Sequence, residues 1–254
     1  MSDFDIATAI NNVENHSNSL YPRSERLSFF DTVLGQPDWE NSKILDIGGN
    51  RGNLLEDLQQ RKIGKEENYY SLDVDQGALD FGKSNYPNAN WIHTDAYNPM
   101  YNKTGNLSQM FPFADNTFDI TVAYSVYSHT THENFIQDLS EIKRVTKPGG
   151  KIGITFVDTD SINFFITKRR QDYPGKFVIN IKDIEESLRK RNEYIYYVDN
   201  DLLIDEINNP DGITHLVTVY NQDWLLKELN SIGIETNIKS VSYTHLTLPT
   251  IYSV

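Results

Sequence analysis

The chain has 254 residues, a formal net charge of −13 and no cysteine. Hydrophobic residues make up 38% of it, which is enough for a packed core and indicates a globular protein. The lack of cysteine excludes disulfides and Cys-ligated metal centres, and the acidic charge disfavours a nucleic-acid partner. The sequence shows no export signal, and no apolar run reaches the roughly 18 residues of a membrane span. We therefore expect a cytoplasmic protein without a membrane partner.

Alternating strands and helices are predicted for residues 41–158, after a polar helical lead at residues 1–40. Short apolar runs predict the strands, and apolar residues at helical spacing predict the helices. The predicted strands are 43–48, 68–73, 89–93, 118–124 and 151–157. The predicted helices are 53–58, 77–86 and one that begins at a capping-box pattern of Thr130 and Glu133. This alternation predicts an α/β fold with a Rossmann-like, mostly parallel sheet and helices on both faces.

The alternation is lost after the fifth strand. Residues 159–218 are aromatic and mixed in charge, with one helical pattern near 184–191, and we expect them to form an inserted cap. Residues 219–240 return to the core: Asn221 is a predicted N-cap for a helix, and 234–240 a predicted sixth strand.

The C-terminal residues have an unusual sequence. Residues 241–250 read VSYTHLTLPT, which resembles a translated sequencing-library adaptor. We therefore expect residues 241–254 to be a non-native tail, and His245 is not a site candidate. The alternative is that Tyr243 to Leu248, which alternates with a period of two, forms a C-terminal strand.

A glycine-rich turn follows the first predicted strand in the sequence DIGGNRG. Gly48 and Gly52 lack a Cβ where the backbone must turn sharply and a ligand must approach it closely. The spacing is not that of a dinucleotide-binding G-x-G-x-x-G motif, because Asn50 stands at its second glycine, and no P-loop sequence occurs. At the end of the next predicted strand, Asp73 is placed to accept hydrogen bonds from both ribose hydroxyls of a nucleoside.

Five segments together resemble successive motifs of the class I S-adenosylmethionine-dependent methyltransferases. In chain order they read LDIGGNRGNLL, SLDVDQGAL, HTDA, FPFADNTFDITVAYSVYSH and RVTKPGGK. The resemblance extends over residues 44–150. It implies S-adenosylmethionine as the cofactor, S-adenosylhomocysteine as the product and methyl transfer as the activity.

The resemblance also implies which residues bind the cofactor. They are Asp46, Gly48, Gly49 and Gly52 at the methionine part, Asp73 with Asp75 as second choice at the ribose, and Asp95 with Ala96 at the adenine edge. The family commonly has glycine at the position of Asn50 and a small residue at that of Arg51. Arg51 either reaches the cofactor carboxylate or points to solvent.

His129, just after the fourth predicted strand, is the candidate catalytic residue. Methyl transfer is an in-line displacement, so positioning is the main task, but a hydroxyl or protonated amine acceptor must also lose a proton. His129 is placed to take that proton; the alternative is that it only packs or caps a helix. We predict no metal-binding residues, because no set of His, Asp and Glu residues has the spacing of metal ligands.

Several other side chains are candidates for the substrate mouth. They are Tyr97, Tyr101, Asn102, Asp158 and Asp160. The basic run Lys168-Arg169-Arg170 either binds an anionic substrate or forms a solvated face. His93, His132 and Glu133 are interpreted as structural.

The sequence thus predicts a methyltransferase acting on a small-molecule acceptor. One alternative is an aminopropyltransferase-like enzyme on the same fold, and another is a cofactor-binding module without catalysis. The acceptor, the atom methylated and the oligomeric state are left open.

Overall fold

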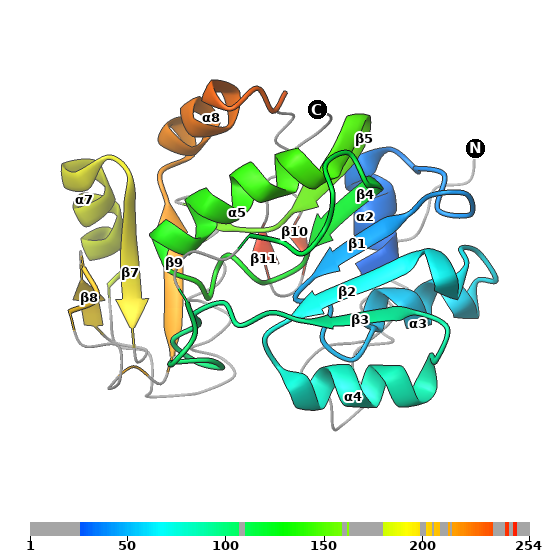
Figure 1. Ribbon diagram of the computed structural model, residues 1–254. Coiled ribbons are helices and arrows are strands. Elements are labelled where there is room, and N and C mark those ends of the chain that lie inside the picture. The colour runs from blue at the N-terminus through cyan, green and yellow to red at the C-terminus, as the bar shows by residue number, and fades with distance from the viewer. Residues whose placement is uncertain are drawn as a thin grey trace.

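The protein is described by a computed structural model. It describes residues 26–106, 110–158, 162, 180–198, 202–204, 206–208, 213, 215–235, 242–243 and 246–247. In these residues, helices and strands build a five-stranded sheet, a four-stranded sheet and a two-stranded hairpin (Figure 1). No helix among them is long and apolar enough to cross a membrane.

The five-stranded sheet is entirely parallel, with the order β3-β2-β1-β4-β5. Its strands are β1 (Ile44–Ile47), β2 (Tyr69–Asp73), β3 (Asn90–His93), β4 (Phe118–Ala123) and β5 (Thr146–Ile154). The predicted Rossmann-like parallel sheet is confirmed, and the first four strands lie where the sequence predicted them. β5 begins at Thr146, earlier than the predicted residue 151. Its pairing with β4 shifts register, so Pro148-Gly149-Gly150 lies within the strand and not before it.

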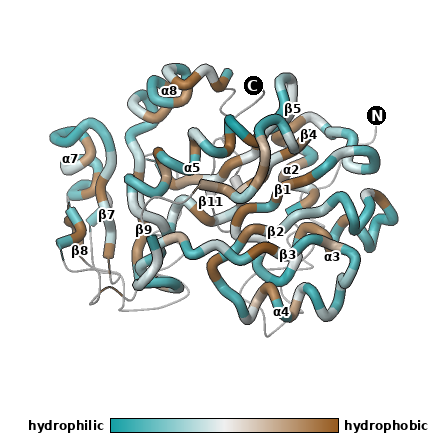
Figure 2. Tube along the Cα trace, viewed as in Figure 1, coloured by the Kyte–Doolittle hydropathy of each residue, from teal (hydrophilic) through white to brown (hydrophobic). Residues whose placement is uncertain are grey.

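Helices cover both faces of this sheet. They are α2 (Arg26–Leu34), α3 (Asn53–Gln60), α4 (Gln76–Asn85), α5 (His132–Val145) and α8 (Gln222–Ser231), with a short 3₁₀ helix at Glu66–Asn68. Alternate residues of β1 belong to different cores: Ile44 to the one that includes residues of α2 and α3, and Leu45 to the one that includes residues of α5 and α8. Figure 2 shows hydrophobic stretches along the central strands and a mixture of hydrophilic and hydrophobic residues along the helices.

The second sheet contains most of the strands that the sequence did not predict. Its order is β6-β9-β7-β8, formed by β6 (Val157–Asp158), β7 (Tyr194–Val198), β8 (Leu202–Ile204) and β9 (Leu216–Tyr220), with α7 (Ile181–Arg191) packed on β7. β9 is parallel to β6 and antiparallel to β7. Every residue of β7 and β9 is buried, so neither strand shows the polar alternation that marks a half-exposed strand. The boundary predicted between residues 218 and 219 falls inside β9.

Helix starts follow capping chemistry. Asn221 accepts a hydrogen bond from the Trp224 amide at 3.0 Å, which confirms the predicted cap of α8. The predicted start of α5 was wrong by one residue: Thr131, not Thr130, is the N-cap, and its hydroxyl accepts from the Asn134 amide.

The C-terminal prediction lies partly outside the described residues. Ile234 and Glu235 belong to no strand, and 236–240 are not described. β10 (Ser242–Tyr243) and β11 (Leu246–Thr247) pair antiparallel with each other, with Tyr243 opposite Leu246. This pairing is that of a hairpin and not of one continuous strand.

Candidate functional site

A crevice of about 690 Å³ lies at the carboxyl ends of β1, β2 and β4. Parallel strands present these ends at one edge of the sheet, where ligands of open α/β folds bind. Of the predicted site residues, Gly48, Asp73, Asp75 and His129 line it. Side chains that the sequence did not single out also line it, among them Arg26, Asn98, Tyr124 and Ser125.

Gly48 brings the backbone to the wall of the crevice. Its φ is +63°, and a Cβ there would overlap with the side chain of Val126. Gly49 and Gly52 do not line the crevice. A Cβ on Gly49 would lie 2.5 Å from the Ser71 hydroxyl, and one on Gly52 2.6 Å from Trp91. These two glycines therefore let the turn pack against β2 and β3.

Asp73 joins the glycine turn to the end of β2. Its two carboxylate oxygens accept hydrogen bonds from the amides of Asn50, at 2.8 Å, and Asp75, at 2.9 Å. Burial raises the pKa of Asp73, and these amide hydrogen bonds oppose the rise. Each oxygen has a further lone pair, so the carboxylate can still accept hydrogen bonds from a ligand in the crevice.

Asn50 and Asp75, whose amides donate to Asp73, each have a structural reason for their residue type. Asn50, where the resembling family commonly has glycine, adopts φ +53°, a left-handed conformation that asparagine tolerates better than most residues. Asp75 caps α4, because its Oδ1 accepts from the Ala78 amide at 3.1 Å. Asp75 thus has a structural role as well as a place on the crevice wall.

Asp46 lies beneath the glycine turn and does not line the crevice. It is 1% exposed, and the Tyr69 hydroxyl donates to its Oδ2 at 2.5 Å. Burial raises the pKa of Asp46 to about 6, while the positive charge of Arg26 and the Tyr69 hydrogen bond oppose the rise.

Asp95 and Ala96 bind the loop that follows β3. The Asp95 carboxylate accepts from the side-chain amides of Asn102 and Asn106, both at 3.0 Å. Asn102 also donates to the Ala96 carbonyl at 3.1 Å. Neither Asp95 nor Ala96 lines the crevice. Of the mouth residues predicted in this loop, Tyr101 lines the crevice and is exposed, whereas Tyr97 is buried.

His129 lines the crevice with a defined ring orientation. Its Nδ1 lies 2.7 Å from the carbonyl oxygen of Leu216 in β9. A carbonyl only accepts, so Nδ1 carries the proton, and Nε2 of the neutral ring is left with a lone pair. The His129 carbonyl accepts from the Asn98 side chain at 3.2 Å.

Strand β9 also holds the backbone on each side of His129. The Thr218 amide donates to the Ser128 carbonyl at 2.9 Å, and the Thr218 hydroxyl donates to the Thr130 carbonyl at 2.6 Å. We call this set of contacts, made by Leu216 and Thr218, the β9 clamp. The only sequence signal for it is the apolar, β-prone run at 216–220.

The remaining candidates lie elsewhere. The ring of His132 stacks on Tyr194 at 4.0 Å between centroids, and His93 contacts the Val74 carbonyl at 3.2 Å, so both have structural contacts. Asp158 is buried at the end of β6. Asp160 and the basic run 168–170 lie outside the described residues.

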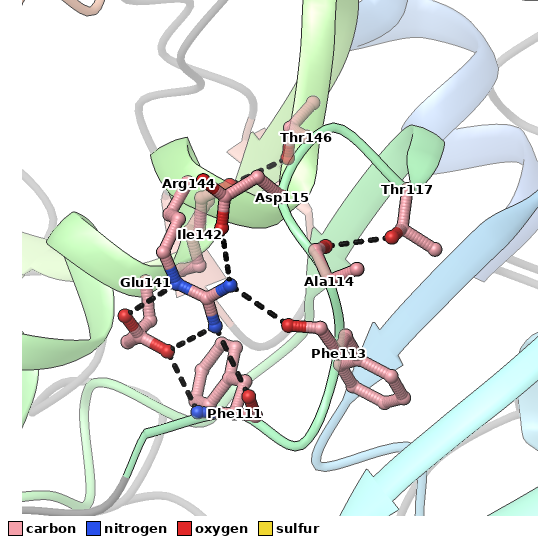
Figure 3. A network of polar contacts seen from close by, with 9 residues as sticks. All are labelled: Phe111, Phe113, Ala114, Asp115, Thr117, Glu141, Ile142, Arg144 and Thr146. Atoms are coloured by element: carbon pink, nitrogen blue, oxygen red, sulfur yellow. Dashed lines mark hydrogen bonds and ion pairs between the residues drawn. The ribbon is translucent and has the colours of Figure 1, made fainter.

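Two of the segments that resemble family motifs meet at Arg144 (Figure 3). Its guanidinium donates to Glu141, to Asp115 and to the carbonyls of Phe111 and Phe113, at 2.6–3.0 Å. The hydrogen bond from Arg144 lowers the pKa of Glu141. These motif residues attach the segment before β4 to α5 and do not enter the crevice.

Comparison with known proteins agrees with this architecture. Residues 45–154 match a family model described as a methyltransferase domain. A ubiquinone/menaquinone biosynthesis C-methyltransferase UbiE from Cupriavidus taiwanensis is 30% identical over 111 residues, which cover 43% of this chain and only 41% of that relative.

Solved structures share the fold over a longer stretch. The PH0226 protein of Pyrococcus horikoshii superposes with a TM-score of 0.59 at 16% identity, covering 93% of this chain and 92% of that one. An S-adenosylmethionine-dependent methyltransferase from Mesorhizobium loti gives 0.52 at 10% identity, covering 86% and 84%. At these identities the likeness shows the fold.

The sheet order and the crevice define a Rossmann-like α/β protein with its site at the carboxyl edge of a parallel sheet. Within it, residues 45–154 form the segment that matches the methyltransferase domain model.

Proposed function

We propose that the protein transfers a methyl group from S-adenosylmethionine to a small-molecule acceptor. The observation that carries this proposal is the meeting of Gly48, Asp73 and His129 around one crevice, inside a segment that matches a methyltransferase domain. Of these residues, the first two serve the cofactor and the third serves the acceptor.

The residues present fit the cofactor. The crevice volume is within the usual range of small-molecule sites, and the missing Cβ of Gly48 lets a ligand lie against the backbone. Asp73, with Asp75 beside it, would hold the ribose hydroxyls, and the turn around Gly48 the methionine part. Asp46, Gly49 and Gly52 would support that turn from below, and Asp95 with Ala96 would shape the loop at the adenine edge.

The bound cofactor would supply a methyl group already activated on a sulfonium. The task of the chain is then to orient the acceptor and, where the acceptor is a hydroxyl or amine, to remove its proton. His129 Nε2 serves as the base, because the Leu216 carbonyl holds the proton on Nδ1. Asn98 and Tyr101, which also line the crevice, would contact the acceptor.

A small acceptor suits both the charge and the cavity. The net charge of −13 repels nucleic acid, and the crevice is of a size for small ligands. The UbiE relative, by its name, is a C-methyltransferase of quinone biosynthesis, which also favours a small molecule.

Calorimetry followed by a product assay tests the proposal. The protein should bind S-adenosylmethionine and S-adenosylhomocysteine, and a methyl-labelled cofactor incubated with metabolite pools should yield S-adenosylhomocysteine and a labelled small molecule. Release of 5′-methylthioadenosine from decarboxylated S-adenosylmethionine, supplied with an amine acceptor in a parallel reaction, would instead show aminopropyl transfer. Binding without any turnover would show a cofactor-binding module.

A further inference from the structure

The backbone around His129 is held by contacts from outside its own segment. This segment, which joins β4 to α5, forms neither helix nor strand, so its carbonyls need partners elsewhere. The β9 clamp binds the carbonyls of Ser128 and Thr130. The carbonyl between them, that of His129, accepts from Nδ2 of Asn98 at 3.2 Å. Asn98 therefore completes a row of three consecutive carbonyls that are all held by other parts of the fold.

The position of Asn98 is itself fixed within the loop that follows β3. Asn98 is 8% exposed, and its amide and carbonyl pair with the carbonyl and amide of Asn102, both at 2.9 Å. At the base of the same loop, the Tyr97 amide donates to the Asn106 carbonyl at 2.9 Å. These backbone pairs determine where the Asn98 side chain begins, so its carboxamide is a fixed point for its neighbours.

The carboxamide of Asn98 joins two parts of the crevice wall. Its Oδ1 accepts from the amides of Met100, at 2.9 Å, and Tyr101, at 3.0 Å, while its Nδ2 donates to the His129 carbonyl. A flipped carboxamide would place its NH₂ group against two N–H donors and its oxygen against a carbonyl. Only the observed orientation satisfies all three partners. One side chain thus connects Tyr101 with His129, and both of these residues line the crevice.

We propose that Asn98, besides lining the crevice, is a positioning residue for methyl transfer. It holds the proposed base His129 and the mouth residue Tyr101 at a fixed separation, so that an acceptor bound at the mouth meets Nε2 of the base. The inference rests on the proposed function. A misplacement of about 1 Å can lower a rate by about 100-fold, so a hydrogen bond to the backbone of a base affects turnover without touching the acceptor.

Two substitutions of Asn98 separate the two ends of its carboxamide. Asn98→Asp keeps an oxygen for the amides of Met100 and Tyr101, but an ionised carboxylate cannot donate to the His129 carbonyl. Asn98→Ala removes both ends. The first variant therefore releases only the base, and the second releases the base and the mouth residue together.

Asn90→Asp is the matched control. Nδ2 of Asn90 also donates to backbone carbonyls, those of Glu67 and Tyr69, both at 3.1 Å. Asn90 is the first residue of β3, at the end of the strand away from the crevice. The control thus has the same change in charge and loses the same kind of hydrogen bond, but it does not touch the site.

Steady-state kinetics with an acceptor from the labelled-methyl screen measures the effect. Asn98→Asp should lower kcat by about 10-fold and leave the KM of the acceptor within about twofold. Asn98→Ala should lower kcat as much and also raise this KM by about three- to tenfold, because Tyr101 is released too. Asn90→Asp should keep both values within about twofold of the wild type. Each kcat is taken per site that binds S-adenosylhomocysteine in calorimetry, so a change in the folded fraction does not enter.

The same substitution in a His129→Ala background shows whether Asn98 acts through His129. Asn98→Asp should change kcat by less than about twofold there, because no base is left to misplace. An equal loss of kcat in both backgrounds would show that the substitution damages the site in general, and it would overturn the inference.

Nitrogen-15 spectra of the imidazoles, recorded with and without S-adenosylhomocysteine, give a readout that needs no acceptor. The His129 signals, assigned by their loss in His129→Ala, should shift in Asn98→Asp and stay in place in Asn90→Asp. Signals that do not move in Asn98→Asp would overturn the role of Asn98. If no acceptor were methylated, the proposed function would fail, whereas the spectra would still decide whether Asn98 positions His129.

Discussion

The imidazole of His129 is held by the carbonyl of Leu216, a residue 87 positions further along the chain, at 2.7 Å from Nδ1. This one contact selects the tautomer in which Nε2 is an acceptor, and it comes from a different sheet than the strand that precedes His129. The orientation of the proposed base thus depends on the docking of β9 against residues 128–130.

Replacement of His129 by alanine should lower turnover by about 100-fold, because a positioned general base contributes at least this much to proton transfer. Affinity for S-adenosylhomocysteine should change far less. The measurement is kcat with an acceptor from the labelled-methyl screen, beside calorimetry of the same variant. A variant that turns over at the full rate would leave His129 with a packing role only.

Thr218→Val should lower kcat by less than His129→Ala does, with S-adenosylhomocysteine affinity retained. The variant removes the hydroxyl that donates to the Thr130 carbonyl, so the segment bearing His129 loses part of the β9 clamp. The buried carbonyl left unpaired should also cost about 1–3 kcal/mol of stability. Thr218→Ser keeps the hydroxyl and should restore kcat. If the melting temperature fell while kcat held, the clamp would be structural alone.

Asp73→Asn should weaken S-adenosylmethionine binding by about 1.5–3 kcal/mol, the usual range for hydrogen bonds to a charged acceptor. Asparagine keeps one oxygen for the Asn50 or Asp75 amide, so the fold should survive. Asp80→Asn, at an exposed carboxylate on α4, is the matched control for charge. Equal dissociation constants for the wild type and Asp73→Asn, on proteins with similar melting curves, would contradict the ribose role.

Asp138→Asn should alter the dependence of stability on pH. Burial raises the pKa of Asp138 from 3.8 to about 7, and the carboxyl contacts the buried Tyr127 hydroxyl at 3.2 Å. Between about pH 4 and pH 7 the folded state keeps a proton on Asp138 that the unfolded chain loses. The contribution of this group to the free energy of unfolding is therefore most favourable below about pH 4. That contribution is lost as the pH rises to about 7, at up to about 1.4 kcal/mol for each pH unit.

An asparagine side chain cannot titrate, so the stability of the Asp138→Asn variant relative to the wild type should rise between about pH 4 and pH 7 and then stay constant. Denaturant unfolding of both proteins at several pH values measures this difference. Parallel stability curves would show that Asp138 titrates as it does in the unfolded chain.

Much of the central sheet could be predicted because its signals are local. The runs at 44–47 and 69–73 are short and apolar, and they end in turn residues, so strand, glycine turn and the position of Asp73 follow from neighbours in sequence. Parallel strands then bring Gly48 and Asp73 to the same edge.

Residues with similar sequence signals turned out to have different places. Asp46, Asp73 and Asp95 are all carboxylates predicted near the ends of strands. In the structure, however, Asp46 lies under the turn with Tyr69, and Asp95 binds Asn102 and Asn106. Which way such a carboxylate faces depends on the side chains packed around it, and those come from other strands.

Only the tertiary structure decided the rest of the site. Arg26 enters the crevice from a helix whose sequence carries no motif, and Leu216 and Thr218 reach His129 from a strand buried on both faces. A buried strand loses its alternating pattern, and a contact between residues far apart in the chain leaves no periodic signal in either segment. The sequence by itself therefore determined the fold class and the cofactor edge, whereas long-range packing determined the orientation of the base and the place of Arg26 on the crevice wall.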